Sequence, residues 1–320
     1  MDLIISHRSA LGFWRHASAT DALAGKKLRA TMLPTKPQDA RRLHAGNPWG
    51  LAMPLHILVG SGSARKTAGS LRCHVSSGRF PHGSFIQAEP GLAVSSPELC
   101  FVQMASELSL VELMMLGYEL CGNYRLNKTS EPEGGFHKGR ALTSVAALDS
   151  FVEKARGLKG RTNARKALRF ITDGSASPME SALTLLLCLP YRLGGYGLPM
   201  PQLNYPIEVG TATRSMPGKQ IYHADLFWLD EQVDVEYDSD AHHLTPEQHA
   251  HDGMRRNALQ ASGIVVLSAT RKQIMNLTRT RKMVEDLSKL LDKRLCCPAL
   301  EFDARHLELR KQLFSNRAAL

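Results

Sequence analysis

Acidic side chains gather in a short stretch of the second half of the chain. Asp225 lies in the mostly apolar segment His-Ala-Asp-Leu-Phe-Trp, and Glu236 follows in Val-Asp-Val-Glu-Tyr-Asp, which ends at Asp238. Because side chains alternate along a strand, Asp234, Glu236 and Asp238 are expected on one face. Carboxylates that converge repel one another unless a divalent cation neutralises them, and oxygen-only ligands suit Mg²⁺ or Mn²⁺. Such an ion would hold a phosphate and activate water for an in-line attack.

Further groups near these acids have two interpretations each. His243 is a candidate general acid or phosphate contact near neutral pH, although an exposed loop histidine needs no such role. Glu180 is a third candidate carboxylate for the metal, but it also fits the N3 position of a helix capping box that begins at Ser177. Arg255 either holds a carboxylate or a phosphate, or forms an ordinary surface ion pair with Asp252 on its helix.

The elements that would position these residues follow from capping signals and from alternation. The turn Asp230-Glu231 would join two strands and bring Asp225 and Glu236 side by side. The predicted order of elements is a helix, three strands, a helix, a strand and a basic helix. This order predicts a mixed sheet with helices on both faces. The expected ranges are helix 178–189, strands 203–209, 222–229 and 232–237, helix 245–262, strand 264–268 and helix 271–294.

The first half of the chain predicts an α+β arrangement. A helix is expected over 7–16 after the N-cap Ser6, and two more begin after Ser96-Pro97 and after Ser109. A basic stretch leads to a turn at 173–175, and the two domains are expected to be 1–165 and 166–320. The other expected elements are strands 55–59, 71–75, 84–87 and 92–94, a loop over 123–140 and a helix over 144–157.

The charge of the chain points to a polyanionic partner. With 40 Lys and Arg against 30 Asp and Glu, the 320 residues carry a net charge of +10, and the isoelectric point is about 9.4. Such a field favours nucleic acid, and Lys and Arg contacts release counterions from a phosphate backbone. The candidate contacts are Arg165 and Lys166 before the second domain and Arg271 and Lys272 on its basic helix, although both groups would also suit solvated helix faces.

The remaining composition excludes several classes of protein. A hydrophobic content of 43% can fill a core, and no apolar run is long enough to span a membrane. The chain does not start with the basic and then apolar pattern of a signal peptide. Its 6 cysteines are scattered and form no Cys-x-x-Cys pair, and the adjacent Cys296 and Cys297 suit neither a local disulfide nor a zinc knuckle. We therefore expect a cytoplasmic protein with reduced thiols and no membrane partner.

The acidic stretch and the helix after it resemble a known nuclease motif. The matching run is Glu180…Asp225…Glu236-Tyr-Asp238-Ser-Asp-Ala-His-His243…Asp252-x-x-Arg255-x-x-x-Leu259-x-x-x-Gly263. It resembles the very-short-patch-repair (Vsr-like) branch of the PD-(D/E)xK endonuclease superfamily, in the form found in actinobacterial proteins. The first half resembles AbiEi-type antitoxins of abortive-infection systems through His7-Arg-Ser-Ala10, Pro54-Leu-His-Ile-Leu-Val59 and Val94-Ser-Ser-Pro97.

This resemblance implies a restriction-endonuclease-like mixed sheet flanked by helices, and a metal-dependent DNA endonuclease or nickase that acts in defence or repair. Asp225 takes the place of the metal-binding Asp, and Glu236 that of the second carboxylate. Asp238 stands where many members have a Lys, and His243 lies where the Vsr branch uses histidines. One alternative is an inactive nuclease fold that binds DNA as a transcriptional regulator. Another is an antitoxin-like protein whose first domain binds a protein partner, and a homodimer also stays open.

Overall fold

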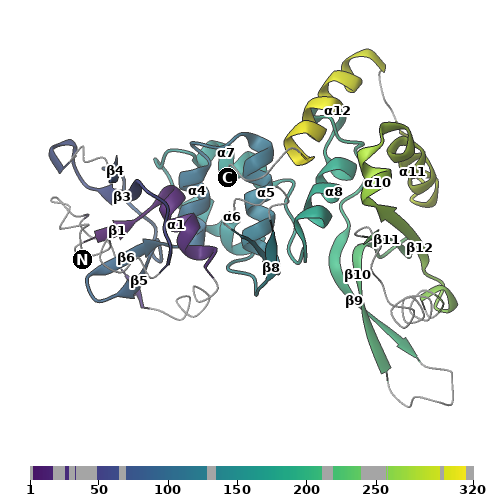
Figure 1. Ribbon diagram of the computed structural model, residues 1–320, viewed down its shortest axis with the longest axis horizontal. Helices are drawn as coiled ribbons and strands as arrows, with labels where there is room; N and C mark the ends of the chain where they lie inside the picture. Colours follow the sequence, from purple (N-terminus) through teal and green to yellow (C-terminus); the bar gives the residue numbers. More distant parts are fainter. Residues whose placement is uncertain are drawn as a thin grey trace. The chain divides into compact units, whose positions relative to one another are not determined.

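The computed structural model describes residues 3–16, 26–28, 33, 49–64, 70–127, 135–210, 219–238, 257, 259–295 and 299–314. They form two compact units, one that ends at Ile171 and one that begins at Thr172. Both units combine a mixed sheet with helices, as the sequence predicted (Figure 1). The expected boundary after residue 165 lies inside helix α7 (Arg161–Leu168). The structure keeps this whole helix in the first unit because it packs on α5 (Leu110–Cys121).

The first unit contains a six-stranded sheet in the order β2-β5-β6-β1-β3-β4. The central strand β1 pairs in parallel with β6 and antiparallel with β3, and all of its residues are buried. The sequence did not predict β1, because three consecutive apolar residues carry no alternation. The bounds are β1 (Leu3–Ile5), β2 (Lys27–Leu28), β3 (Leu55–Val59), β4 (Leu71–Val75), β5 (Phe85–Glu89) and β6 (Leu92–Ser95).

Helices α4–α7 pack against one another beside this sheet, and α1 contacts both α4 and the strands β3 and β6 (Figure 1). The predicted caps at Ser96 and Ser109 are present, whereas Ser6 precedes α1 without a capping hydrogen bond from its side chain. The Ser96 hydroxyl accepts a hydrogen bond from Leu99 N at 3.3 Å, and Ser109 and Glu112 form a capping box at the start of α5. The bounds are α1 (His7–Trp14), η1 (Gly62–Ala64), α4 (Pro97–Met104), α5 (Leu110–Cys121), α6 (Val145–Lys154) and α7 (Arg161–Leu168).

The segment 123–140, predicted as a loop, instead contains the antiparallel strands β7 (Tyr124–Leu126) and β8 (Phe136–Lys138). Buried polar groups hold β7 in place. The Glu119 carboxylate accepts a hydrogen bond from Leu126 N at 3.1 Å, and Arg125 donates to the Glu119 carbonyl oxygen at 2.8 Å. The loop prediction is wrong because these contacts stabilise a strand that has no apolar alternation.

The second unit contains a four-stranded sheet in the order β12-β11-β10-β9. Strands β9, β10 and β11 are antiparallel neighbours, and β12 pairs in parallel with β11. The described helical residues 259–261 lie between β11 and β12 in the chain, as a parallel connection requires. This mixed sheet confirms the predicted fold class. The bounds are β9 (Gln202–Gly210), β10 (Lys219–Trp228), β11 (Val233–Asp238) and β12 (Val265–Thr270).

The helices of the second unit depart from the prediction at two points, one of which is α12 (Ala299–Phe314), a helix that the sequence did not predict. The single helix expected over 271–294 is wrong, because α10 ends at Met275 and the Asn276 side chain caps α11 by accepting a hydrogen bond from Arg279 N at 3.0 Å. The helix expected over 245–262 lies outside the described residues apart from its end. The bounds are α8 (Pro178–Cys188), η2 (Tyr191–Leu193), α10 (Arg271–Met275), α11 (Leu277–Leu290) and α12 (Ala299–Phe314).

Candidate active site

Asp225 lies at an irregular point of β10. Ala224 and Phe227 belong to one buried cluster although an even spacing would be needed to place them on the same face of a regular strand. The pairing of β10 with β9 also skips Asn204, whose φ of 51° is uncommon outside glycine. The alternation of β10 is therefore broken around Asp225.

The Asp225 carboxylate is turned toward β11. Its Oδ2 accepts a hydrogen bond from the Tyr237 backbone N–H at 2.8 Å. The regular pairing of the two strands runs from Trp228–Val233 to Leu226–Val235 and ends there, and Asp225 and Glu236 are the next residues along the two strands. These two acids therefore lie on neighbouring antiparallel strands at adjoining positions, as the tight turn between the strands led us to expect.

The three acids of β11 differ in exposure. Asp234 is 0% exposed, Glu236 is half-buried and Asp238 is exposed. Asp225, Glu236 and Asp238 do not form a group of three ligands within 4.8 Å of one another in the described part of the chain. Among the described acids, the pair Asp225 and Glu236 thus combines adjacency with partial exposure, which are the properties that a metal site needs.

Glu180 lies at the start of α8, as its motif suggested, but its carboxylate accepts from Ala176 N, the residue before the N-cap, and not from the N-cap Ser177 itself. The Ser177 hydroxyl accepts a hydrogen bond from Glu180 N at 3.1 Å, and Glu180 Oε2 accepts one from Ala176 N at 2.7 Å. Its carboxylate therefore stabilises the first turn of α8. The two other candidates of the motif, His243 and Arg255, lie outside the described residues.

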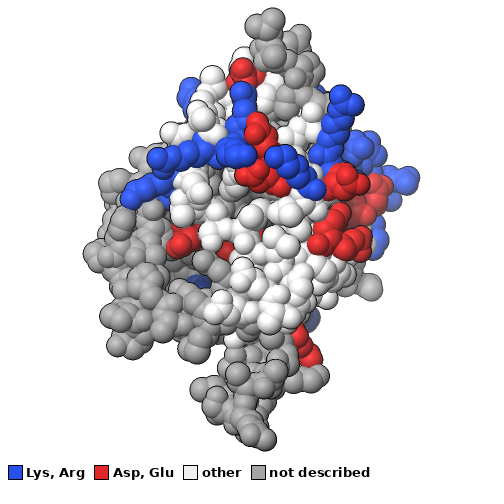
Figure 2. All heavy atoms as spheres, turned by 90° about the vertical axis from the view of Figure 1, so that its right-hand side faces the viewer, with Lys and Arg blue, Asp and Glu red and all other residues white. Residues whose placement is uncertain are grey.

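Positive charge lies close to the strand that carries Glu236. Ser268 of β12 pairs with Glu236, and it lines a hollow of about 430 Å³ together with Arg279 and Lys282. Figure 2 draws the side of the molecule that lies to the right in Figure 1. Lys and Arg side chains lie across its upper part, with Asp and Glu side chains among them. Lys282 pairs with Asp286 at 3.0 Å, so part of this charge is already balanced.

The predicted phosphate contacts are exposed. Arg271 and Lys272 form the first turn of α10, directly after β12. Arg165 and Lys166 lie on the exposed side of α7 in the first unit, opposite the buried Ala164 and neighbouring residues. Both positions suit a phosphate contact and a solvated helix face equally.

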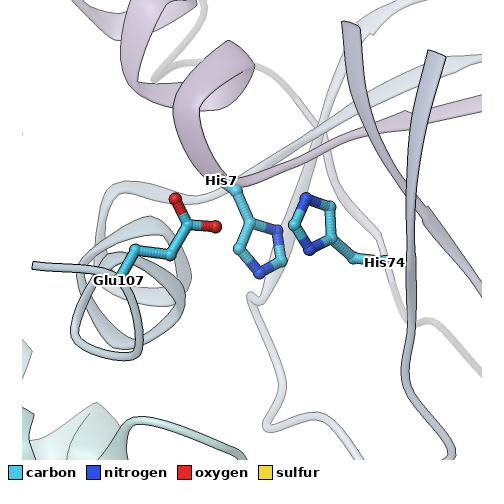
Figure 3. Close-up of side chains that lie close together, drawn as sticks. All are labelled: His7, His74 and Glu107. Atoms are coloured by element: carbon cyan, nitrogen blue, oxygen red, sulfur yellow. The ribbon is translucent and has the colours of Figure 1, made fainter. Parts of the chain in front are cut away.

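A second group of ligand side chains lies in the first unit and was not predicted. His7 begins α1, His74 lies in β4 and Glu107 follows α4, and their ligand atoms all lie within 4.8 Å of one another (Figure 3). The two imidazole rings are stacked with centroids 3.5 Å apart. Their wide separation along the chain explains why no motif pointed to them.

Two buried histidines at this group, His7 and its neighbour His56, are uncharged at neutral pH. Burial lowers the pKa of His7 from 6.5 to about 2, and His74, His56 and Lys159 act in the same direction through charge repulsion. Burial likewise lowers the pKa of His56. Uncharged imidazole is the form that ligates metal ions.

Comparison with known proteins identifies two curated relatives. The chain is 30% identical over 131 residues to "Uncharacterized protein Rv2248" of Mycobacterium tuberculosis strain H37Rv and to "Uncharacterized protein MT2308" of strain CDC 1551. The match covers 40% of this chain and 44% of each relative, which is less than half of their length. No family model and no solved structure matches the chain significantly. None of the described helices has the length and apolar character that crossing a membrane requires.

Proposed function

We propose that the second unit is a Mg²⁺- or Mn²⁺-dependent nuclease domain that hydrolyses phosphodiester bonds in DNA. The observation that carries this proposal is the position of Asp225 and Glu236 at adjoining sites of the paired strands β10 and β11. Two carboxylates from neighbouring strands form an oxygen ligand set, which suits a small, hard dication. Both side chains are partly exposed, so a metal and a substrate can reach them.

Asp225 and Glu236 are the residues that would hold the ion. The hydrogen bond from Tyr237 N to Asp225 Oδ2 orients this carboxylate, and a carboxylate has further lone pairs for a metal. When bound, the ion supplies neutralising charge for a phosphate and lowers the pKa of a coordinated water. Asp238, exposed at the end of β11, would accept a hydrogen bond from solvent or substrate.

The order of elements supports the same proposal. Helix α8, strands β9–β11, the helical residues 259–261 and strand β12 follow one another in the order that capping signals and strand alternation predicted. They give a mixed sheet with helices, which is the architecture that the Vsr-like resemblance implies. A fold by itself does not imply a function, so the two carboxylates stay the decisive feature.

DNA is the proposed partner and the cytoplasm the proposed compartment. The net charge of +10 and the exposed Arg271, Lys272 and Arg279 near β12 favour a polyanion. The described cysteines Cys73, Cys100, Cys121 and Cys188 are reduced, which is typical of a reducing compartment.

The test is cleavage of supercoiled plasmid DNA by the purified full chain. We expect nicking with Mg²⁺ or Mn²⁺ and none with EDTA. Asp225→Asn and Glu236→Gln should each reduce cleavage to background, whereas Glu231→Gln on the exposed turn between the strands should retain it. Full activity of both Asp225→Asn and Glu236→Gln would contradict the proposal.

DNA binding without cleavage is the second candidate function, as in a transcriptional regulator or an antitoxin-like protein. The hydrogen bond between Asp225 and Tyr237 N favours it, because this contact stabilises the sheet whether or not a metal binds. In that case, gel-shift assays would show DNA binding of equal affinity with Mg²⁺ and with EDTA. Asp225→Asn and Glu236→Gln would leave this binding unchanged, and no metal would produce cleavage.

A further inference from the structure

We propose that the first unit contains a transition-metal site of its own, in which His7, His74 and Glu107 bind Zn²⁺. Their ligand atoms lie within 4.8 Å of one another (Figure 3). The His7 and His74 rings are stacked nearly parallel, so one of them must rotate for both to direct a ring nitrogen at one ion. Two imidazoles and one carboxylate are a recurrent ligand set of zinc sites that keep a further coordination position open. The site lies in a different unit from Asp225 and Glu236 and goes beyond the proposed nuclease activity.

Neighbouring groups orient both histidines through one ring nitrogen each. His7 Nδ1 lies 3.0 Å from Ser6 Oγ, which assigns Nε2 of His7 to the metal. His74 Nε2 lies 3.0 Å from Nδ1 of the buried His56, which assigns Nδ1 of His74 to the metal. Contacts of this kind select the tautomer of a ligating imidazole and hold its ring in place.

The third ligand, Glu107, is oriented by the residue that follows His7 in the chain. Arg8, which follows His7 in α1, donates a hydrogen bond from Nε to Glu107 Oε2 at 3.1 Å. In Figure 3 the His7 ring lies between Glu107 and His74. One turn of α1 therefore supplies one ligand and positions another.

His7 itself has a strained backbone. Its φ of 48° lies in the left-handed region, which residues other than glycine rarely adopt. Two contacts hold the chain there: Ser6 N donates to the His56 carbonyl oxygen at 2.9 Å, and His7 N donates to Gln103 Oε1 at 3.0 Å. Strain that the surrounding structure maintains in this way is concentrated at functional sites.

The three ligands line a cavity of about 620 Å³, which has room for a metal ion and an external ligand. Gln103 lines it as well, and its buried Nε2 has no hydrogen-bond partner among the described residues. A buried donor without an acceptor is costly, so a water or an anion bound to the metal would satisfy it. Arg72 and Lys159 line the same cavity and favour an anion in the open coordination position.

The test is Zn²⁺ binding to the full chain after its metals have been removed with a chelator. All proteins carry Asp225→Asn and Glu236→Gln, so that the acids of the second unit do not contribute. Calorimetric titration should show a tight Zn²⁺ site. Changing a residue that only orients a metal ligand lowers the metal affinity by ~10–100-fold. We expect His56→Gln to lower the Zn²⁺ affinity by an amount in this range. His74→Ala and Glu107→Gln, which each remove a ligand, should lower it by more.

His137→Ala is the matched control, because His137 lies on β8 of the same unit and outside the cavity. The His137→Ala variant should bind Zn²⁺ as tightly as its parent does. With Co²⁺ as a spectroscopic probe, the parent should show the visible bands of a site with nitrogen and oxygen ligands, and His74→Ala with Glu107→Gln should lose them. Circular dichroism verifies that each variant is folded. Equal Zn²⁺ affinity and stoichiometry in this double variant and its parent would overturn the proposal.

Discussion

The Asp225 carboxylate and the Tyr237 backbone N–H are joined by a 2.8 Å hydrogen bond across β10 and β11. The bond ties the point where β10 loses its alternation to the strand that carries Glu236. Asp225 thus has two roles in the proposed site, because it holds two strands together and would ligate a metal. Substitution can separate these roles, since Asn keeps a hydrogen-bond acceptor but loses the charge.

Asp225→Asn should abolish metal-dependent cleavage and leave the free energy of unfolding of the second unit nearly unchanged. Asp225→Ala also removes the acceptor, and the unsatisfied Tyr237 N–H should cost about 1–3 kcal/mol. Urea unfolding and plasmid cleavage, both measured on the two variants, check this prediction. Equal destabilisation by Asn and Ala would mean that the hydrogen bond has no structural role.

Removing the positive charge near β12 should weaken DNA binding for every sequence. All three residues, Arg271, Lys272 and Arg279, are exposed. Arg279 lines the same hollow as Ser268, the residue of β12 that pairs with Glu236. Replacing all three by Ala should flatten the slope of log affinity against log salt by ~0.9 for each phosphate that the variant no longer neutralises. Cleavage by complexes that are already bound should change far less, because such residues position the DNA rather than react with it.

The matched comparison is the triple Ala variant of Arg165 and Lys166 on the exposed side of α7 and of Arg169, the exposed C-cap of this helix in the first unit. Fluorescence anisotropy with labelled duplex DNA at several salt concentrations gives the slope for each variant. An unchanged slope in one variant identifies its three cations as a solvated helix face that does not bind DNA.

The buried ion pair between Arg15 and Glu119 should be essential for the first unit. Arg15 donates to both carboxylate oxygens, at 2.8 and 2.7 Å, and the two side chains are 8% and 1% exposed. Burial alone would lower the pKa of Arg15, but the Glu119 carboxylate reverses this and raises it. Arg15→Met leaves a buried charge without its partner, which should cost about 3–5 kcal/mol in urea unfolding.

Replacing both partners of this pair should cost less than replacing one. Arg15→Met with Glu119→Gln removes both charges and keeps an acceptor for Leu126 N, so much of the lost stability should return. Arg281→Met breaks the exposed pair with Asp303 and should leave the unfolding free energy nearly unchanged. If Arg15→Met behaves like Arg281→Met, the buried pair does not stabilise the fold.

His306 should make the second unit less stable at acidic pH. Burial is the main reason that its pKa lies below 6.5. Arg310 and Arg281 lower it further, while the hydrogen bond to the Gly194 carbonyl oxygen and the charge of Asp303 raise it. The unfolded chain therefore takes up a proton at a higher pH than the folded chain does. Stability is complete above the unfolded pKa and decreases as the pH falls through 6.5 toward the folded pKa.

Thermal unfolding of the wild type and of His306→Gln between pH 7.5 and pH 5 checks this prediction. Gln can still donate a hydrogen bond to Gly194 but does not titrate, so the variant should lose less stability on acidification than the wild type does. Parallel pH profiles of the two proteins would show that His306 does not contribute to the acid sensitivity.

Helix starts could be predicted from the sequence because they depend on contacts within one turn. Ser96, Ser109, Ser144 and Ser177 each cap a helix by accepting a hydrogen bond from a backbone N–H three residues later. The strands β3 and β4 also have the predicted bounds, because apolar residues between turn signals mark buried strands. The break at Asn276 was missed because its neighbours are compatible with a continuous helix, and only the packing of two helices places a cap there.

The sequence by itself determined the pairing of β10 with β11, and hence the adjacency of Asp225 and Glu236, because a tight turn leaves two consecutive strands little choice of partner. Only the tertiary structure decided that Asp225 turns toward Tyr237 N and that His7, His74 and Glu107 meet. These contacts depend on which strands and helices pack together over long stretches of chain. No spacing of residues encodes that packing, since it follows from the burial of the whole core.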